Sequence, residues 1–192
     1  MTIADQVVQL LRDTGALLEG HFLLTSGLHS PRYVQCARVL QYPQHAEALG
    51  TWLAESVHAQ AIDVVISPAL GGVIIGHEVA RSLGVRAVFG ERQDGVMTLR
   101  RGLEIRPAER VFVVEDVTTT GGSVREIIQL VQTCRGLVVG AGAILDRSGG
   151  QADVGVPLQA LATLSVPTNS PQDCALCRQG STAVKPGSRQ IA

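Results

Sequence analysis

Lysine is almost absent from this sequence, because fifteen of its sixteen cationic residues are arginine and Lys185 is the only lysine. Aromatic residues make up 3% of the chain, and the formal net charge is -1. Nucleic-acid-binding proteins usually carry a broad basic field, which this composition excludes. Any binding site for an anion must therefore be local.

Long apolar runs are also missing, and none reaches the roughly 18 residues that a membrane span requires. The opening segment MTIADQVVQLLRDTG contains acids and lacks a basic start, so it does not resemble a signal peptide. We therefore expect a soluble, cytoplasmic protein whose four cysteines stay reduced. Cys36 and Cys134 are interpreted as ordinary small apolar residues.

The chain of 192 residues is long enough for one domain with a substantial core. From Ile62 onward, apolar runs without alternation are separated by helical segments, which predicts an α/β fold with a mostly parallel sheet flanked by helices. The expected strands of this sheet are 62–66, 85–89, 111–114, 137–145 and 158–164. The expected helices are Thr2 to Gly20, 43–60, 73–83 and 123–134, and short strands are expected at 21–27 and 31–40. We assign residues 1–165 to a single domain and residues 166–192 to a carboxyl-terminal tail with little regular structure.

The strongest signal of function is the segment VFVVEDVTTTGGS at residues 111–123. An apolar strand ends there in two acids and continues through hydroxyl and glycine residues into a helix. The backbone N–H groups of such a turn and the following helix N-terminus form a cradle for a phosphate. The two acids would repel a phosphate, but carboxylates accept hydrogen bonds from a sugar diol. This combination predicts a binding site for a sugar phosphate.

The same segment resembles the motif with which type I phosphoribosyltransferases bind phosphoribosyl pyrophosphate (PRPP). That motif is an apolar strand followed by an acidic pair and T-x-G-G-S. The resemblance implies a type I phosphoribosyltransferase-like fold in which residues 1–42 contribute a small amino-terminal hood that binds the base. It also implies that PRPP is bound by Glu115, Asp116, Val117, Thr118, Thr119, Thr120, Gly121, Gly122 and Ser123.

Three further segments resemble the orotate enzymes of this family. HFLLTSG at 21–27, followed by SPRY at 30–33, is similar to their base-binding segment, and SPALGG at 67–72 is similar to their pyrophosphate loop. Leu145-Asp146-Arg147 resembles the L-D-R whose arginine contacts orotate, and a guanidinium fork suits a carboxylate. The resemblance implies PRPP binding by Gly71 and Gly72, and orotate binding by Thr25, Ser26, Tyr33, Thr119 and Arg147.

The charged stretch 90–107 lies between expected strands, which predicts a mobile loop or hairpin. The corresponding catalytic loop of the family usually contains Arg, Lys and His, and some relatives also carry lysines where this chain has Thr25 and Gly71. Arg92, Arg100 and Arg101 are therefore the candidate catalytic cations, beside the acids Glu115 and Asp116. The alternative interpretation of these arginines is a solvated hairpin face.

The resemblance implies a Mg²⁺-dependent pentosyltransferase of pyrimidine biosynthesis, which converts orotate and PRPP to orotidine 5'-phosphate and pyrophosphate. Mg²⁺ would be bound with PRPP, without metal ligands from the protein, and the protein would be a homodimer. Two alternatives stay open: a type I transferase for a purine base, and a non-catalytic PRPP-sensing regulator. The segments around Thr25 and Arg147 argue against the first. The second should bring a nucleic-acid-binding surface, and the sequence has no basic cluster or helix-turn-helix segment.

Cys174 and Cys177 form a C-x-x-C pair in the tail, which could supply half of a tetrahedral zinc site or form a redox pair. The sequence has no second such pair, and its five histidines are scattered without metal-like spacing, so they are interpreted as structural or exposed. A zinc site would then be incomplete within one chain, although two subunits could complete it across a dimer axis. We expect no role of this pair in the transferase chemistry, because every substrate-binding motif lies upstream of Pro167.

Overall fold

The computed structural model describes residues 1–24 and 26–186, and a six-stranded sheet with the order β5-β4-β3-β6-β7-β8 lies at its centre. The parallel strands are β3 (Val64–Pro68), β4 (Arg86–Gln93), β6 (Arg110–Thr118), β7 (Leu137–Asp146) and β8 (Leu158–Thr163). The edge strand β5 (Val96–Leu99) pairs antiparallel with β4. The prediction of a mostly parallel sheet is confirmed.

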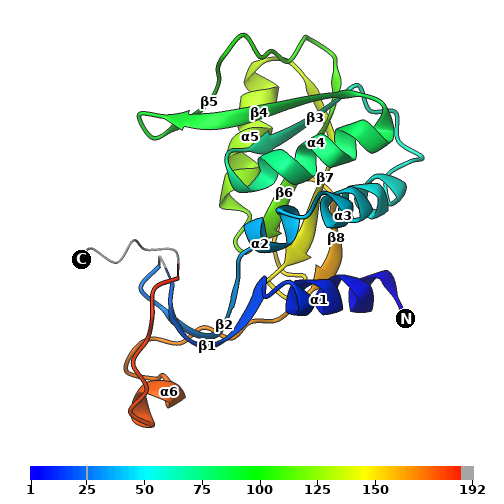
Figure 1. Cartoon of the computed structure of the whole chain (residues 1–192). Coiled ribbons are helices and arrows are strands. Elements are labelled where there is room, and N and C mark those ends of the chain that lie inside the picture. The colour runs from blue at the N-terminus through cyan, green and yellow to red at the C-terminus, as the bar shows by residue number, and fades with distance from the viewer. Residues whose placement is uncertain (25, 187–192) are drawn as a thin grey trace.

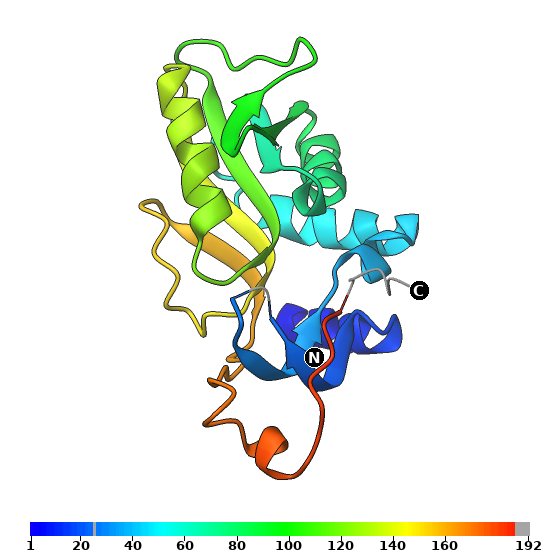
Figure 2. The same ribbon diagram turned by 90° about the vertical axis from the view of Figure 1, so that its left-hand side faces the viewer.

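Helices cover both faces of this sheet, as Figures 1 and 2 show. Val65 of β3 packs in one core cluster with α3 (Pro43–Glu55) and α4 (Gly71–Leu83), whereas Val64 and Ile66 pack in a second cluster with α5 (Gly122–Thr133). Burial on both faces explains why the strands are apolar without alternation. None of the helices in the described part of the chain is long and apolar enough to cross a membrane.

The amino-terminal region forms a separate two-stranded sheet, in which β1 (Leu17–Leu23) pairs antiparallel with β2 (His29–Val34). It is preceded by α1 (Ile3–Asp13), which starts at the predicted capping box of Thr2 and Asp5. The expectation of a helix to Gly20 was wrong, because α1 ends at Asp13 and the chain turns at Gly15, whose φ of 63° is left-handed. The expected strand 31–40 was also too long, since Ala37–Leu40 forms the short helix α2.

The tail runs along the β1–β2 sheet at the end of the molecule away from β5 (Figures 1 and 2). Its regular structure, within the described residues, is the four-residue helix α6 (Ala175–Arg178) and two isolated bridges. One bridge joins Phe22 to Val184 and the other joins His29 to Asn169. Both bridges attach the described part of the tail to the hood.

Candidate active site

The predicted site lies where the strand order of the central sheet reverses. From β3 the chain crosses through α4 to β4 on one side, and from β6 it crosses through α5 to β7 on the other. The carboxyl ends of β3 and β6 therefore open a crevice between them, which is where ligands bind in open α/β sheets. Both the 67–72 loop and the 115–123 segment start at these ends.

The end of β6 and the start of α5 form a cavity of about 90 Å³, lined by Glu115 and residues 117–124. Gly121 is the N-cap of α5 and has a φ of 75°, and among the residues that the structure describes no side chain caps this helix end. A Cβ at Gly121 would lie 2.5 Å from Cγ1 of Val154, so both the backbone and the space require glycine. The uncapped N–H groups at the positive end of α5 suit a phosphate.

Glu115 and Asp116 place two carboxyl groups beside this cavity. Glu115 is 8% exposed, and its burial together with the neighbouring charge of Asp116 raises its pKa to about 9. No salt bridge within the described residues reaches either carboxyl group. The pair is thus arranged to accept hydrogen bonds or a cation from a ligand.

The loop after β3 approaches this acidic pair closely. A Cβ on Gly71 would lie 2.8 Å from Oδ2 of Asp116, and a Cβ on Gly72 would lie 3.1 Å from Oε1 of Glu115. These contacts explain why small residues start α4. The structure therefore brings the predicted pyrophosphate loop and the predicted ribose-binding acids together.

A larger cavity of about 700 Å³ lies between the hood and the cradle. Its lining includes four of the five residues that were expected to bind orotate, namely Ser26, Tyr33, Thr119 and Arg147. The fifth, Thr25, lies outside the described residues. Val117, Thr119 and Thr120 line both cavities, so one ligand can extend from the small cavity into the large one.

Arg147 is held at the wall of the large cavity by the turn that follows β7. The buried carboxylate of Asp146 accepts hydrogen bonds from the N–H groups of Ser148 (2.7 Å) and Gly150 (2.8 Å), and the N–H of Arg147 donates to the Thr118 carbonyl oxygen at 2.8 Å. Burial lowers the pKa of the Arg147 guanidinium. Its Nε is buried, and no hydrogen-bond acceptor reaches it within the described residues. A buried donor without a partner is costly, so this atom is a candidate donor to a ligand.

The three candidate arginines of the 90–107 stretch lie elsewhere. This stretch begins as a β4–β5 hairpin around Asp94 and Gly95, both with positive φ, and the hairpin extends past the last β3–β4 pair, Pro68 and Gly90. Arg92 forms an ion pair with Glu126 at 2.8 Å, and Glu91 lies 3.0 Å from Arg101 and 3.7 Å from Arg100. None of the three is among the residues that line the two cavities. Their catalytic role stays a prediction.

The Phosphoribosyl transferase domain family matches this chain over residues 36–156, which contain the cradle, the pyrophosphate loop and Arg147. The chain belongs to the phosphoribosyltransferase family. Among its relatives, the orotate phosphoribosyltransferase of Caldicellulosiruptor bescii is 56% identical over 186 residues, 97% of this chain and 98% of the relative. The orotate phosphoribosyltransferase of Pelotomaculum thermopropionicum is 56% identical over 187 residues, with the same coverage of 97% and 98%.

Solved phosphoribosyltransferases share the fold. A crystal structure of orotate phosphoribosyltransferase from Aeropyrum pernix has a TM-score of 0.69 at 27% identity and covers 82% of this chain and 93% of its own. The Mycobacterium tuberculosis orotate phosphoribosyltransferase in complex with inorganic phosphate has a TM-score of 0.68 at 22% identity and covers 85% of this chain and 96% of its own. The latter supports the fold alone. The type I phosphoribosyltransferase-like fold predicted from the sequence is confirmed.

Some cavity residues of this phosphoribosyltransferase domain were not predicted. Gln35 and Cys36 line the large cavity just after Tyr33, and burial raises the pKa of the Cys36 thiol well above its ordinary value. Thr168 also lines it, so the cavity extends beyond the predicted binding motifs, all of which lie upstream of Pro167. Gln35 lies inside the predicted strand 31–40, two residues after Tyr33, which was a usable signal, but no pattern in the tail distinguishes Thr168.

Proposed function

We infer that this chain is an orotate phosphoribosyltransferase, which transfers ribose 5-phosphate from PRPP to orotate and releases pyrophosphate. The observation that carries this conclusion is the buried Nε of Arg147, which has no hydrogen-bond partner among the described residues, in a cavity that adjoins a phosphate cradle. The substrate named for the relatives from Caldicellulosiruptor bescii and Pelotomaculum thermopropionicum agrees with it. A buried guanidinium suits a carboxylated pyrimidine better than a neutral purine base.

The two adjoining cavities suggest how the substrates are placed. The 5-phosphate of PRPP would lie in the small cavity on the N–H groups of Gly122 and Ser123, with the ribose diol against Glu115 and Asp116. Orotate would occupy the large cavity between the hood and Arg147, with Tyr33 and Ser26 beside it. The shared wall of Val117, Thr119 and Thr120 would then lie next to the reacting anomeric carbon.

The residues of the site act by placing the reactants and balancing charge. As the bond to pyrophosphate breaks, the ribosyl centre becomes oxocarbenium-like, and the acidic pair lies on the side where positive charge develops. Holding both substrates in line lowers the entropic cost of their encounter. The reaction requires no nucleophilic side chain from the protein.

Mg²⁺ bound with PRPP would neutralise the charge of the leaving pyrophosphate. The donor set of the site fits a complex of this kind, since Glu115 and Asp116 offer only oxygen atoms and have no cationic partner among the described residues. The closeness of Gly71 to Asp116 would place a diphosphate bound along the loop next to this acidic pair.

We also propose that the protein acts as a cytoplasmic homodimer, in which the hairpin of one subunit serves the site of its partner. In support, the loop arginines form ion pairs within their own chain and lie away from both cavities. The hairpin also extends past the carboxyl end of β3, which is the end of the sheet that carries the site.

The test is the loss of orotate absorbance after PRPP is added, with and without Mg²⁺. We expect turnover with orotate that depends on Mg²⁺ and no turnover with uracil, adenine or hypoxanthine. Turnover of a purine base in place of orotate would support the purine transferase. Tight PRPP binding without turnover of any base would support the sensor.

A further inference from the structure

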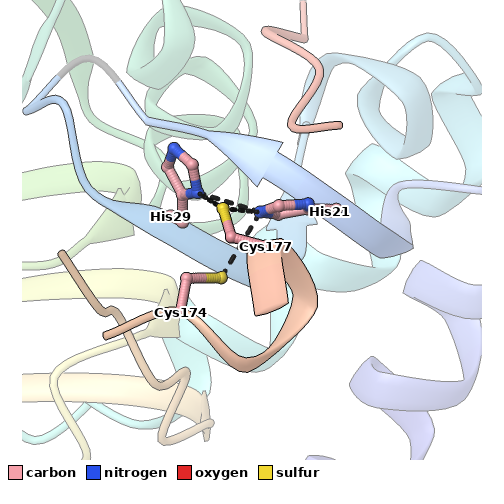
Figure 3. A group of neighbouring side chains, drawn as sticks. All are labelled: His21, His29, Cys174 and Cys177. Carbon is pink, nitrogen blue, oxygen red and sulfur yellow. Dashed lines mark hydrogen bonds between the residues drawn. The ribbon is translucent and has the colours of Figure 1, made fainter. Parts of the chain in front are cut away.

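The C-x-x-C pair of the tail does not lie alone. Cys174, at the N-cap of α6, and Cys177 meet His21 of β1 and His29 of β2, and one ligand atom of each lies within 4.8 Å of the other three. Figure 3 shows the four side chains pointing toward one another. His21, His29 and Cys174 are 7%, 8% and 3% exposed, and Cys177 is partly buried. The expectation that no histidine partners the cysteines within one chain was wrong.

We propose that His21, His29, Cys174 and Cys177 form a structural zinc site of the Cys₂His₂ type, which clamps the tail to the hood. Two imidazole nitrogens and two thiolates are a ligand set that closes a tetrahedral structural zinc site without an open position. Hard cations such as Mg²⁺ prefer oxygen ligands, so the site is chemically distinct from that of Mg²⁺–PRPP.

The distances agree with this geometry. His21 Nε2 lies 2.9 Å from His29 Nδ1 and 3.4 Å from Cys174 Sγ, and Cys177 Sγ lies 3.2 Å from His29 Nδ1 and 3.8 Å from His21 Nε2. Zinc–nitrogen and zinc–sulfur bonds of about 2.0 and 2.3 Å at tetrahedral angles separate neighbouring ligand atoms by roughly 3.3 to 3.8 Å. The observed separations require movements of about 1 Å or less to receive the ion.

The second nitrogen of His21 has the partner that a zinc ligand requires. Nδ1 lies 3.1 Å from the carbonyl oxygen of Ser181 and 3.2 Å from its hydroxyl. Because a carbonyl oxygen only accepts, Nδ1 carries the proton, and Nε2 keeps its lone pair for the centre of the cluster. Histidine ligands of zinc are commonly oriented by this kind of hydrogen bond to a carbonyl group.

The tail also needs a clamp, because it has little apolar surface to bury. In the part of the tail that the structure describes, Val166 and Cys174 are the buried apolar side chains. Backbone hydrogen bonds join Asn169 to His29 (2.8 and 2.9 Å) and Val184 to His21 and Leu23 (both 2.9 Å). Segments with so small a core are usually held by a metal or a disulfide.

The clamp lies next to the wall of the large cavity. His29 directly follows Leu28, and its backbone partner Asn169 directly follows Thr168, and both Leu28 and Thr168 line the cavity. Zinc would thus fix the hood and the tail around the base without touching a substrate. Cys174 and Cys177 would be positioning residues, not catalytic ones.

The direct test is the metal content of the full-length protein, measured by inductively coupled plasma mass spectrometry. The protein is expressed without a histidine tag in medium supplemented with zinc. We expect about one zinc ion per chain, and a value near zero in Cys174→Ser/Cys177→Ser and in His21→Ala/His29→Ala. Cys134→Ser, a cysteine on the far end of α5, is the matched control and should keep its zinc. A wild-type protein without zinc that also fails to bind added Zn²⁺ would overturn the proposal.

A second measurement does not depend on the folding of variants. Removing the metal from the wild-type protein with a chelator should accelerate tryptic cleavage after the exposed Arg178 at least severalfold, and re-addition of Zn²⁺ should restore protection. A mass lower by two hydrogens, from a disulfide between Cys174 and Cys177 in protein purified without oxidant, would overturn the zinc site. Unchanged cleavage after complete removal of the metal would overturn the clamp. Neither result depends on the identity of the transferred base.

Discussion

The backbone N–H of Asp116 donates a hydrogen bond of 3.1 Å to Oε1 of Glu115, which holds the Glu115 carboxyl group at the mouth of the phosphate cradle. This contact favours the charged form of Glu115, but burial and the charge of Asp116 outweigh it and raise the pKa from 4.5 to about 9. Glu115 is thus neutral at physiological pH in the ligand-free protein.

The stability of the ligand-free protein should therefore decrease as the pH rises. In the unfolded chain Glu115 loses its proton near pH 4.5, whereas in the folded protein it keeps the proton to about pH 9. The folded state binds more protons between these values, so the free energy of unfolding falls through this window. Melting temperatures at about pH 6 and about pH 8 would measure the slope, which should be smaller in Glu115→Gln. A slope that is unchanged in this variant would contradict the raised pKa of Glu115 in the folded protein.

Asp116→Asn should lower kcat/KM for PRPP roughly ten- to hundredfold, since a charge-assisted hydrogen bond contributes about 1.5 to 3 kcal/mol. Glu115→Gln should also lower turnover and PRPP binding, but less, because glutamine resembles the neutral form of this residue. Steady-state kinetics with varied PRPP would give both effects, and circular dichroism would verify the fold. The exposed Glu55→Gln is the control. Normal kinetics in both acidic-pair variants would refute the ribose-binding role.

If the hairpin acts on the neighbouring subunit, two inactive variants should complement each other. Arg100→Ala/Arg101→Ala lacks the loop cations, and Glu115→Gln/Asp116→Asn lacks the acidic pair. Mixed dimers contain one site with both features intact, so part of the activity should return after subunit exchange. If mass spectrometry shows that subunits have exchanged but no activity returns, action on the neighbouring subunit is contradicted. These arginines would then act within their own chain or not at all.

The sequence predicts the contiguous parts of this molecule well. Residues 111–123 contain a strand, the two acids and the start of a helix in one continuous segment. The cradle can therefore be predicted from the order of residues in that segment alone. Gly84 closes α4 with a φ of 71°, as its place after Leu83 predicts. Local spacing was less reliable in the hood, where Leu17 and Leu18 fit a helical pattern but belong to β1.

Contacts between distant segments could not be predicted in the same way. His21 and Cys174 are 153 residues apart, and their meeting depends on the path of a tail with few apolar residues. The path of the tail also brings Thr168 to the wall of the large cavity. The lack of ordinary zinc spacing in the sequence is explained by the origin of the ligands, two from paired strands and two from the tail.

The recognition of orotate by Arg147 is tested most directly by separate calorimetric titrations of Arg147→Ala with orotate and with PRPP. We expect orotate affinity to fall roughly ten- to hundredfold, for the loss of charge-assisted hydrogen bonds of about 1.5 to 3 kcal/mol, and PRPP affinity to stay near that of the wild type. Arg12→Ala, at an exposed position of α1, should leave both affinities unchanged. Orotate affinity that is unchanged in Arg147→Ala, or PRPP affinity that falls equally, would contradict this account.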